Sequence, residues 1–355
     1  MLTRVADAAR DARDGDIVEI DAGGYSDDVA SWPQNDLTIR GVGGQARMSS
    51  AGTSAEGKAI WVIKGNNVVV ENIAFAGAYV PGRNGAGIRH EGGKLTVRGC
   101  LFERNEMGLL TWNSPSAELL VEASEFRDNA VAQAYAQEDP GHQIYVGRIR
   151  RFTLRSSYVH RGAFGHLVKS RARENRIYYN RLTDEKEGRA SYELEFPEGG
   201  IAYVLGNIIQ QSAHSENEIL ISYGAEGYKW PQNELYLASN TLVDGLPSGG
   251  RFLRVALGAD RVKAFNNLLL GRDRLEEPGS GSRAGNFHVR ATDFVAADSF
   301  DYRLRKASAP VGLAVDPGTA NGTSLRPEYE YLHPMRLRPI RKGRLSPGAQ
   351  QTILP

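Results

Sequence analysis

Short apolar strands recur along the chain, and most of them end in a small polar residue, often asparagine. Residues 235–240 read LYLASN, and residues 262–267 read VKAFNN. Apolar and polar positions alternate within these runs, which is typical of strands with one face in a core and the other toward solvent. The pattern therefore predicts many short strands of similar design.

The closing polar residues return at intervals of 23 to 33 residues. A period of this length indicates a solenoid in which each coil adds its strands to those of the previous coil. We expect the closing residues to lie in register, so that one asparagine side chain can bond the next. These anchors are Asn72, Cys100, Ser124, Ser157, Asn180, Asn207, Asn240 and Asn267.

The coils from about Asp14 to Gly271 resemble the right-handed parallel β-helix proteins of the pectate-lyase type. This resemblance implies an all-β fold, a single-stranded right-handed parallel β-helix. Helical spacing of apolar residues predicts an N-terminal capping helix within residues 1–13. We expect the β-helix domain to span 14–315, with residues 300–304 in its closing coil, and 316–355 to form an extended tail packed on it.

Overall charge limits the classes of partner. The chain has 43 Lys and Arg against 42 Asp and Glu, a net charge of +1. This balance argues against a nucleic-acid binder and against a basic membrane-surface protein. No run of 18 apolar residues predicts a membrane span. We expect a secreted or periplasmic protein whose signal peptide was removed, with a cytoplasmic location as the alternative; it is a monomer or a homo-oligomer.

Positive charge is concentrated between His142 and Arg181. This stretch holds ten Lys and Arg, opposed only by Glu174, which leaves a local net charge of +9. Such a surface would attract an anionic substrate. The alternative is that these side chains are solvated and balance the charge of the acidic run that follows, at residues 184–187.

Alignment on the anchors predicts which side chains share a face. Ile144, Leu167 and Leu194 each lie 13 residues before the next anchor, so we expect them to stack inward. The neighbouring positions would then point outward, and His166 would stack on Glu193, with Glu195 about 7 Å along the same strand.

Two further resemblances suggest a chemistry. Residues 165–171 (GHLVKSR) with 174–180 (ENRIYYN) resemble the alginate-lyase and chondroitinase B family, which implies Lys169 as a base. Residues 139–142 (DPGH), 157–160 (SYVH) and 165–168 (GHLV) are similar to mannuronan C5-epimerases. Both families first remove the proton next to a uronate carboxylate.

We therefore expect a polysaccharide lyase that cleaves an acidic, uronate-containing polysaccharide by β-elimination, in a groove on the coils from about 85 to 230. Lys169 or His166 would remove the proton, and Arg171 or Arg148 would neutralise the carboxylate. The expected catalytic residues are His166, Lys169, Glu193 and Glu195. The expected substrate-binding residues are His142, Tyr145, Arg148, His160, Arg171 and Tyr223.

Three alternatives stay open. A glycoside hydrolase would use Glu193 and Glu195 as acid and base, because their separation on one strand fits an inverting pair. A uronate C5-epimerase and a non-catalytic carbohydrate-binding solenoid are the others. Trp61, Trp112 and Trp230 are candidates for stacking on sugar rings. The sequence requires no cofactor, and a calcium ion is an option that no residue pattern supports.

Overall fold

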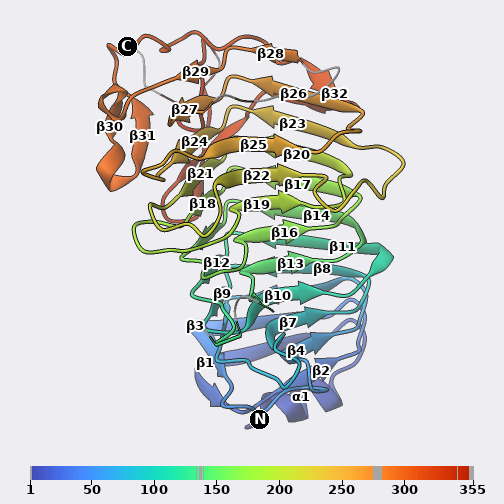
Figure 1. Cartoon of the computed structure of the whole chain (residues 1–355). Helices are drawn as coiled ribbons and strands as arrows, with labels where there is room; N and C mark the ends of the chain where they lie inside the picture. The colour runs from blue at the N-terminus through green and yellow to red at the C-terminus, as the bar shows by residue number, and fades with distance from the viewer. Residues whose placement is uncertain are drawn as a thin grey trace.

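The alternating strands wind into a right-handed parallel β-helix, shown in the computed structural model of Figure 1. The structure describes residues 2–132, 134–135, 138, 140–273, 275, 282–341 and 343–351. Every strand from β1 to β29 pairs only in parallel, each with the equivalent strand of the next coil. The predicted fold class is confirmed.

One face of the tube is a nine-stranded parallel sheet, which lies in front in Figure 1. Its strands are short, since each coil gives this face only three to five residues. In stacking order they are β2 (Ala30–Trp32), β4 (Ala59–Ile63), β7 (Ala86–His90), β10 (Met107–Thr111), β13 (Ile144–Val146), β16 (Val168–Ser170), β19 (Leu194–Phe196), β22 (Ile219–Tyr223) and β25 (Arg251–Val255).

The other strands from β1 to β29 form one continuous 20-stranded sheet with two rows. The rows are joined at the first coils, because β1 (Ile17–Ser26) and β3 (Thr38–Ser49) are long enough to run around the corner between them. One row continues as β5 (Val68–Glu71), β8 (Lys94–Arg98), β11 (Ser114–Glu122), β14 (Ile149–Arg155), β17 (Glu174–Tyr178), β20 (Ile201–Leu205), β23 (Glu234–Ala238), β26 (Arg261–Phe265) and β28 (Ser282–Ala284). The other continues as β6 (Ile73–Ala76), β9 (Leu101–Glu103), β12 (Glu125–Arg127), β15 (Tyr158–His160), β18 (Arg181–Thr183), β21 (Ile208–Gln211), β24 (Thr241–Asp244), β27 (Leu268–Leu270) and β29 (Phe287–His288).

The core fills the inside of the tube with side chains from all three rows. Aromatic rings stack from coil to coil, with centroid separations of 4.4 to 5.3 Å, from Trp32 through Trp61 to Phe126. Trp61 is fully buried in this stack. It therefore cannot offer a surface to a sugar, contrary to one expectation from the sequence.

The anchors form a buried ladder where the two rows of the long sheet meet. The Nδ2 atom of Asn180 donates to Oδ1 of Asn207 at 3.0 Å, and the same bond repeats from Asn207 to Asn240 and from Asn240 to Asn267. Asn72 is one residue out of register, since the flanking pairs align Ile73 with Cys100. Asn72 instead occupies a left-handed turn position with φ of 57°, a conformation that asparagine tolerates well.

The two ends of the tube are closed differently. Helix α1 (Val5–Asp11) packs against the first strand of the nine-stranded sheet, as the predicted capping helix would. At the other end the parallel coils stop at β29, before the expected boundary near 315. Residues 300–304 do not form a coil, because β31 (Asp301–Leu304) pairs antiparallel with β30 (Phe294–Ala296).

The C-terminal segment packs back along the long sheet. It contains the short antiparallel pairs β32 (Thr319–Ala320) with β33 (Thr323–Ser324) and β34 (Tyr329–Leu332) with β35 (Arg336–Pro339), after the 3-10 turns Ala291–Asp293 and Ala297–Ser299. Tyr331 and Ala349 pack on Ile208 and Val243 of that sheet. No helix within the described ranges is long and apolar enough to cross a bilayer.

Candidate functional site

The outer face of the nine-stranded sheet carries one row of aligned side chains. Tyr145, Lys169, Glu195 and Ser222 are paired across β13, β16, β19 and β22. Ile144 pairs with Val168 and not with Leu167, so the expected alignment was wrong by one residue in this coil. The reason is a turn between β16 and β17 that is one residue shorter than the turns before and after it.

The shift changes the neighbours of His166. Its ring lies between the rings of His142 and Tyr192, with centroids 4.7 and 4.9 Å away, and it does not stack on Glu193. The Nε2 atom of His166 nevertheless lies 2.9 Å from Oε2 of Glu195, and Nζ of Lys169 lies 3.3 Å from the same oxygen. Three of the four expected catalytic residues therefore meet.

Glu193 is the fourth, and it lies apart from this cluster. Its side chain is fully buried, and Oε1 lies 3.4 Å from the hydroxyl of Ser215. Burial raises the pKa of Glu193 well above its ordinary value, and the nearby carboxyl of Asp184 raises it further. The two glutamates expected to act as a pair thus differ in surroundings and in charge.

Two arginines extend the cluster into a chain of alternating charges. The guanidinium of Arg171 binds both carboxylate oxygens of Glu226 at 2.7 Å, and its Nε lies 3.3 Å from Glu198. Arg148 makes a bidentate contact with Glu198 at 2.6 and 2.7 Å. Nζ of Lys169 also reaches Glu226, at 3.2 Å. Such a network holds each charged group in one position.

Tyr145 joins this network at the edge of a groove. Nη1 of Arg171 donates a hydrogen bond to the hydroxyl oxygen of Tyr145, and the guanidinium carbon lies 5.2 Å from the centre of the phenol ring. The ring of His142 meets that of Tyr145 edge-on at 5.3 Å. A guanidinium in this place would stabilise negative charge that develops on the phenol oxygen.

His142 is held in one protonation state. The backbone N–H of His166 donates to Nδ1 of His142 at 2.9 Å, so a neutral His142 carries its proton on Nε2. Burial lowers the pKa of His142 well below its ordinary value, as do the nearby His166, Lys169 and Arg171. His142 is therefore a neutral hydrogen-bond donor. The pKa of His166 is also lowered, mainly by burial, although Glu195 opposes the shift.

The other expected substrate-binding residues divide into two groups. His142, Tyr145, Arg148 and Arg171 belong to the cluster just described. His160 lies on β15 of the long sheet, where Nε2 is 3.1 Å from Glu125 and the ring stacks on Tyr158. Tyr223 is fully buried, and its hydroxyl donates to the carbonyl of Gly200. The structure does not bring these last two residues to the site.

The basic stretch from 142 to 181 is largely neutralised by other coils. Nine of its ten Lys and Arg make ion pairs, as Arg151 does with Glu174 and Arg155 with Glu122. In a solenoid the spatial neighbours of a residue are one coil away in sequence. A charge count over consecutive residues therefore overstates the local surface charge.

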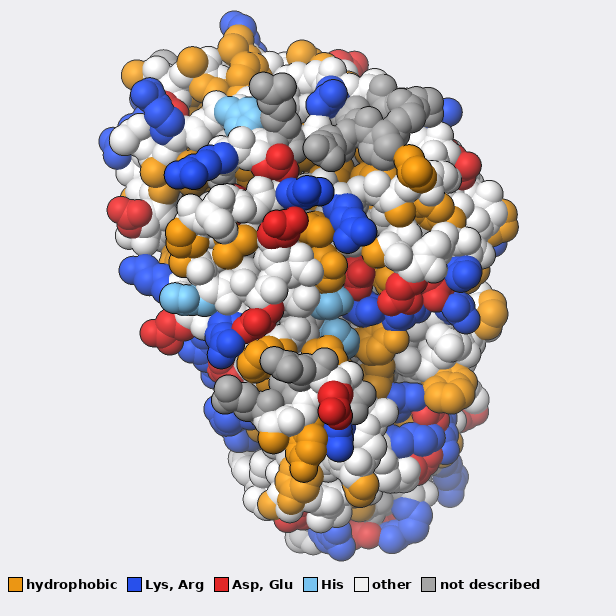
Figure 2. All heavy atoms as spheres, viewed as in Figure 1, with side chains coloured by type: hydrophobic (Ala, Val, Ile, Leu, Met, Phe, Trp, Pro, Cys, Tyr) orange, Lys and Arg blue, Asp and Glu red, His pale blue; other side chains and the backbone are white. Residues whose placement is uncertain are grey.

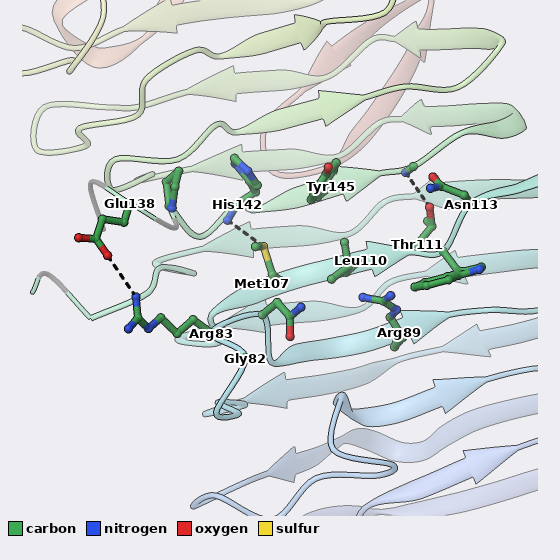
Figure 3. A pocket seen from close by; sticks show the side chains of 14 residues that line it. Gly82, Arg83, Arg89, Met107, Leu110, Thr111, Asn113, Glu138, His142 and Tyr145 are labelled. Carbon is green, nitrogen blue, oxygen red and sulfur yellow. Dashed lines mark hydrogen bonds and ion pairs between the residues drawn. The ribbon is translucent and has the colours of Figure 1, made fainter. Parts of the chain in front are cut away.

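An open groove of about 380 Å³ lies directly beside the cluster, over β7, β10 and β13. On this face Figure 2 shows histidine side chains next to acidic and basic ones near mid-height, with a hollow beside them. Figure 3 shows Arg89, Leu110 and Tyr145 on successive strands along the groove, with His142 close to Tyr145. Sequence reasoning missed Arg89 and Arg83, although Arg89 has the outward position of an alternating strand.

The described part of the chain contains no group of three or more His, Cys, Asp or Glu side chains that could hold a metal ion. Asp139, from the segment similar to epimerases, lies outside the described residues. Of the tryptophans expected to stack on sugars, Trp112 is 57% exposed in the groove wall. The indole N–H of Trp230 donates to the carbonyl of Arg171 at 3.1 Å.

Comparisons with known proteins show which solved structures share this fold. No family model and no curated protein sequence matches the chain. Among solved structures, the chain is similar to the pectate lyase Pel9A, with 11% identity and a TM-score of 0.50, covering 98% of this chain and 90% of that one. It is also similar to a PL6 alginate lyase in complex with a trisaccharide, with 15% identity and a TM-score of 0.38, covering 77% of this chain and 58% of that one. The chain therefore shares the parallel β-helix fold of polysaccharide lyases, at a sequence distance at which only the fold is shown.

Proposed function

We propose that the protein is a polysaccharide lyase that cleaves a uronate-containing polysaccharide by β-elimination at the groove beside Tyr145. The observation that carries this proposal is the hydrogen bond from Arg171 to the Tyr145 hydroxyl at the groove wall, next to the neutral His142. The fold shared with polysaccharide lyases agrees with it, although fold alone does not determine function.

The reaction needs one proton to move between two positions of the sugar chain. The C5 proton leaves, the C4–O4 bond breaks, a C4=C5 double bond forms, and the departing O4 gains a proton. The carbanion next to the carboxylate must be stabilised by hydrogen-bond donors or cations. A single acid–base group can take the C5 proton and deliver it to O4.

Tyr145 is the group that fits this role. Its side chain lines the groove, whereas His166 is not among the lining residues and Nζ of Lys169 lies between the carboxylates of Glu195 and Glu226. Arg171 stabilises the negative charge on the phenol oxygen while that oxygen carries no proton. The fixed Nε2–H of His142 supplies a donor for the charge that develops on the substrate carboxylate. Lys169 and Glu195 then act as positioning residues.

The alternatives are less well supported by the geometry. An inverting hydrolase needs two carboxyl groups on opposite sides of one glycosidic bond, but Glu193 is fully buried and Glu195 is bound to His166 and Lys169. A C5-epimerase would share the first step and return the proton to the other face of C5. It therefore needs a proton donor on the opposite face of C5 in place of protonation of O4, and its product shows the difference.

Product analysis decides between these functions. The protein is incubated with polygalacturonate, polymannuronate, polyguluronate and chondroitin, and with dextran as a neutral control, each with and without added calcium. A lyase produces ultraviolet-absorbing unsaturated ends from an acidic polymer. Reducing ends without such absorbance would indicate a hydrolase, and inversion at C5 seen by NMR without chain cleavage would indicate an epimerase. Either result would overturn the proposal.

A further inference from the structure

Arg89 is a buried guanidinium with free hydrogen-bond donors at the groove. It lies on β7 and is only 9% exposed. Its Nε lies 3.4 Å from Oε1 of Glu91, but this contact lacks hydrogen-bond geometry. Among the described residues, neither of its terminal nitrogens has a hydrogen-bond partner. These terminal donors are open to the groove and are not used by the described part of the protein, which points to an anionic ligand that accepts hydrogen bonds from them.

Other arginines of this face show what a satisfied guanidinium looks like here. Arg171 and Arg148 each contact at least one carboxylate within 2.7 Å. Glu91, the acidic neighbour of Arg89, is itself bound by Nζ of Lys58 at 2.9 Å. Arg89 thus differs from Arg148 and Arg171, and the difference lies at the open groove.

The groove places an aromatic platform beside this charge. Trp112 is 57% exposed, and its ring centre lies 5.3 Å from the guanidinium carbon of Arg89. Exposed indole rings offer a flat apolar surface to the C–H face of a sugar ring, with the N–H left for water or ligand. Asn113 also lines the groove, and its Oδ1 accepts the backbone N–H of Arg148 at 2.8 Å. Its amide NH₂ has no partner within the described part of the chain, so it can serve a sugar hydroxyl.

We propose that this groove is a binding subsite for an acidic sugar of an oligosaccharide, whose carboxylate binds Arg89 and whose ring packs on Trp112. The inference rests on the proposed function for the identity of the polymer. Arg89 and Tyr145 are two coils apart through Leu110, roughly 10 Å along the stack. The sugar held at Arg89 is therefore not the one that reacts at Tyr145. The ligand is an extended acidic chain that follows the stack.

Binding measurements test this subsite independently of turnover. The probes are the trisaccharides of galacturonate, mannuronate and guluronate and their methyl esters, measured by calorimetry with the full chain. At least one free acid should bind, and its ester should bind at least tenfold more weakly, the order expected for charge-assisted hydrogen bonds. Arg89→Gln should weaken the acid by a similar factor, and Trp112→Ala should weaken both forms. The control is Arg98→Gln. Arg98 lies on the long sheet and already pairs with Glu71 and Glu122, so its replacement should change affinity less than about threefold.

The outcomes separate this inference from the proposed function. If a trisaccharide binds through Arg89 but no polymer gives unsaturated ends, the subsite stands and the lyase proposal fails. If polymers are cleaved but Arg89→Gln and Trp112→Ala bind like the parent, the subsite is wrong and the lyase proposal stands. The subsite is also wrong if no free acid binds, or if acid and ester bind equally. If Arg89→Gln fails to fold, the affinity of Trp112→Ala for the trisaccharide tests the subsite. This variant should fold, because Trp112 is exposed and its replacement removes no core contact.

Discussion

Nε2 of His166 lies 2.9 Å from Oε2 of Glu195, although the register of the sheet places His166 beside Tyr192. Nζ of Lys169 lies 3.3 Å from the same oxygen, so one buried carboxylate holds two groups from the preceding coil. Burial opposes ionisation of Glu195, but the contacts with His166 and Lys169 outweigh it and lower the pKa of the carboxyl below its ordinary value. Glu195 therefore stays ionised and attracts both groups by its charge, because neither contact has hydrogen-bond geometry.

Replacing Glu195 by glutamine should disturb this arrangement without reaching the groove directly. Without the charge, Lys169 is left with Glu226 alone and His166 loses its carboxylate partner. We expect lyase activity to fall by roughly 10- to 100-fold, the range for residues that orient others, with partial recovery in Glu195→Asp. The measurement is the rate of unsaturated product across pH. Glu218→Gln, at an exposed glutamate, is the matched control. Equal rates and equal pH profiles for Glu195→Gln and the parent would contradict a positioning role.

Tyr145→Phe tests the proton transfer itself. The change removes one hydroxyl and leaves the ring contacts with His142 and Arg171 in place. We expect activity to fall by roughly 100- to 10,000-fold, as for the loss of a general acid–base group, with the melting temperature nearly unchanged. Tyr228→Phe is the matched control, because its hydroxyl donates only to the carbonyl of Ala256. Activity within about threefold of the parent would place the proton transfer on another residue, since such a loss is far below that range.

The fold could be predicted from the sequence because its determinants repeat. The asparagine anchors recur at the spacing of one coil, and the same side chains form the buried ladder from Asn180 to Asn267. Asn72 misled the alignment because asparagine suits two neighbouring positions, the anchor and the left-handed turn before it. The predicted end of the β-helix lay too far along the chain. The strands of the hairpin β30–β31 alternate apolar and polar residues, as the strands of a coil do.

The arrangement of the expected site residues was predicted in part, and the misses have different physical causes. His166, Lys169 and Glu195 could be placed together because they lie on strands of successive coils. The expected stack of His166 on Glu193 was wrong because the turn after β16 is one residue shorter, so Leu167 and not His166 lies level with Glu193. Glu193 itself is buried because its position in the coil faces inward, as that of Leu167 does. Arg89 was missed because its interest comes from having no hydrogen-bond partner among the described residues. Whether a residue has such a partner depends on side chains from other coils, which are distant in sequence.

The asparagine ladder can be tested at Asn207. Its Oδ1 accepts bonds from the backbone and side chain of Asn180, and its Nδ2 donates to Ile177 and Asn240. Asn207→Ala leaves several buried polar groups without partners, so we expect a loss of more than about 3 kcal/mol in the free energy of unfolding. Urea denaturation followed by circular dichroism measures this loss. Asn217→Ala removes a single bond to a backbone N–H and should cost less than about 1.5 kcal/mol. Similar losses in both variants would mean that the ladder adds no special stability.

Glu193 should control how stability depends on pH. Burial raises the pKa of Glu193 well above its ordinary value and that of Asp184 to about 7. The native state therefore keeps these protons while the unfolded chain releases them, so the free energy of unfolding falls as pH rises from about 4 to about 7. The loss should be on the order of 4 kcal/mol for each group that keeps its proton over these roughly three pH units, since a tenfold difference in proton affinity between the two states corresponds to about 1.4 kcal/mol.

Glu193→Gln replaces the neutral carboxyl with a neutral amide of the same shape, which cannot ionise in either state. The variant should thus lose less stability than the parent over this pH range, and near neutral pH it should be at least as stable. Thermal unfolding at about pH 4 and about pH 8, at the two ends of this transition, measures the difference, with the exposed Glu218→Gln as control. An unchanged pH dependence in Glu193→Gln would show that Glu193 is ionised in the native protein. A carboxylate buried there would need a cationic partner, and the described residues around it, Asp184, Ser215 and Asp244, supply none.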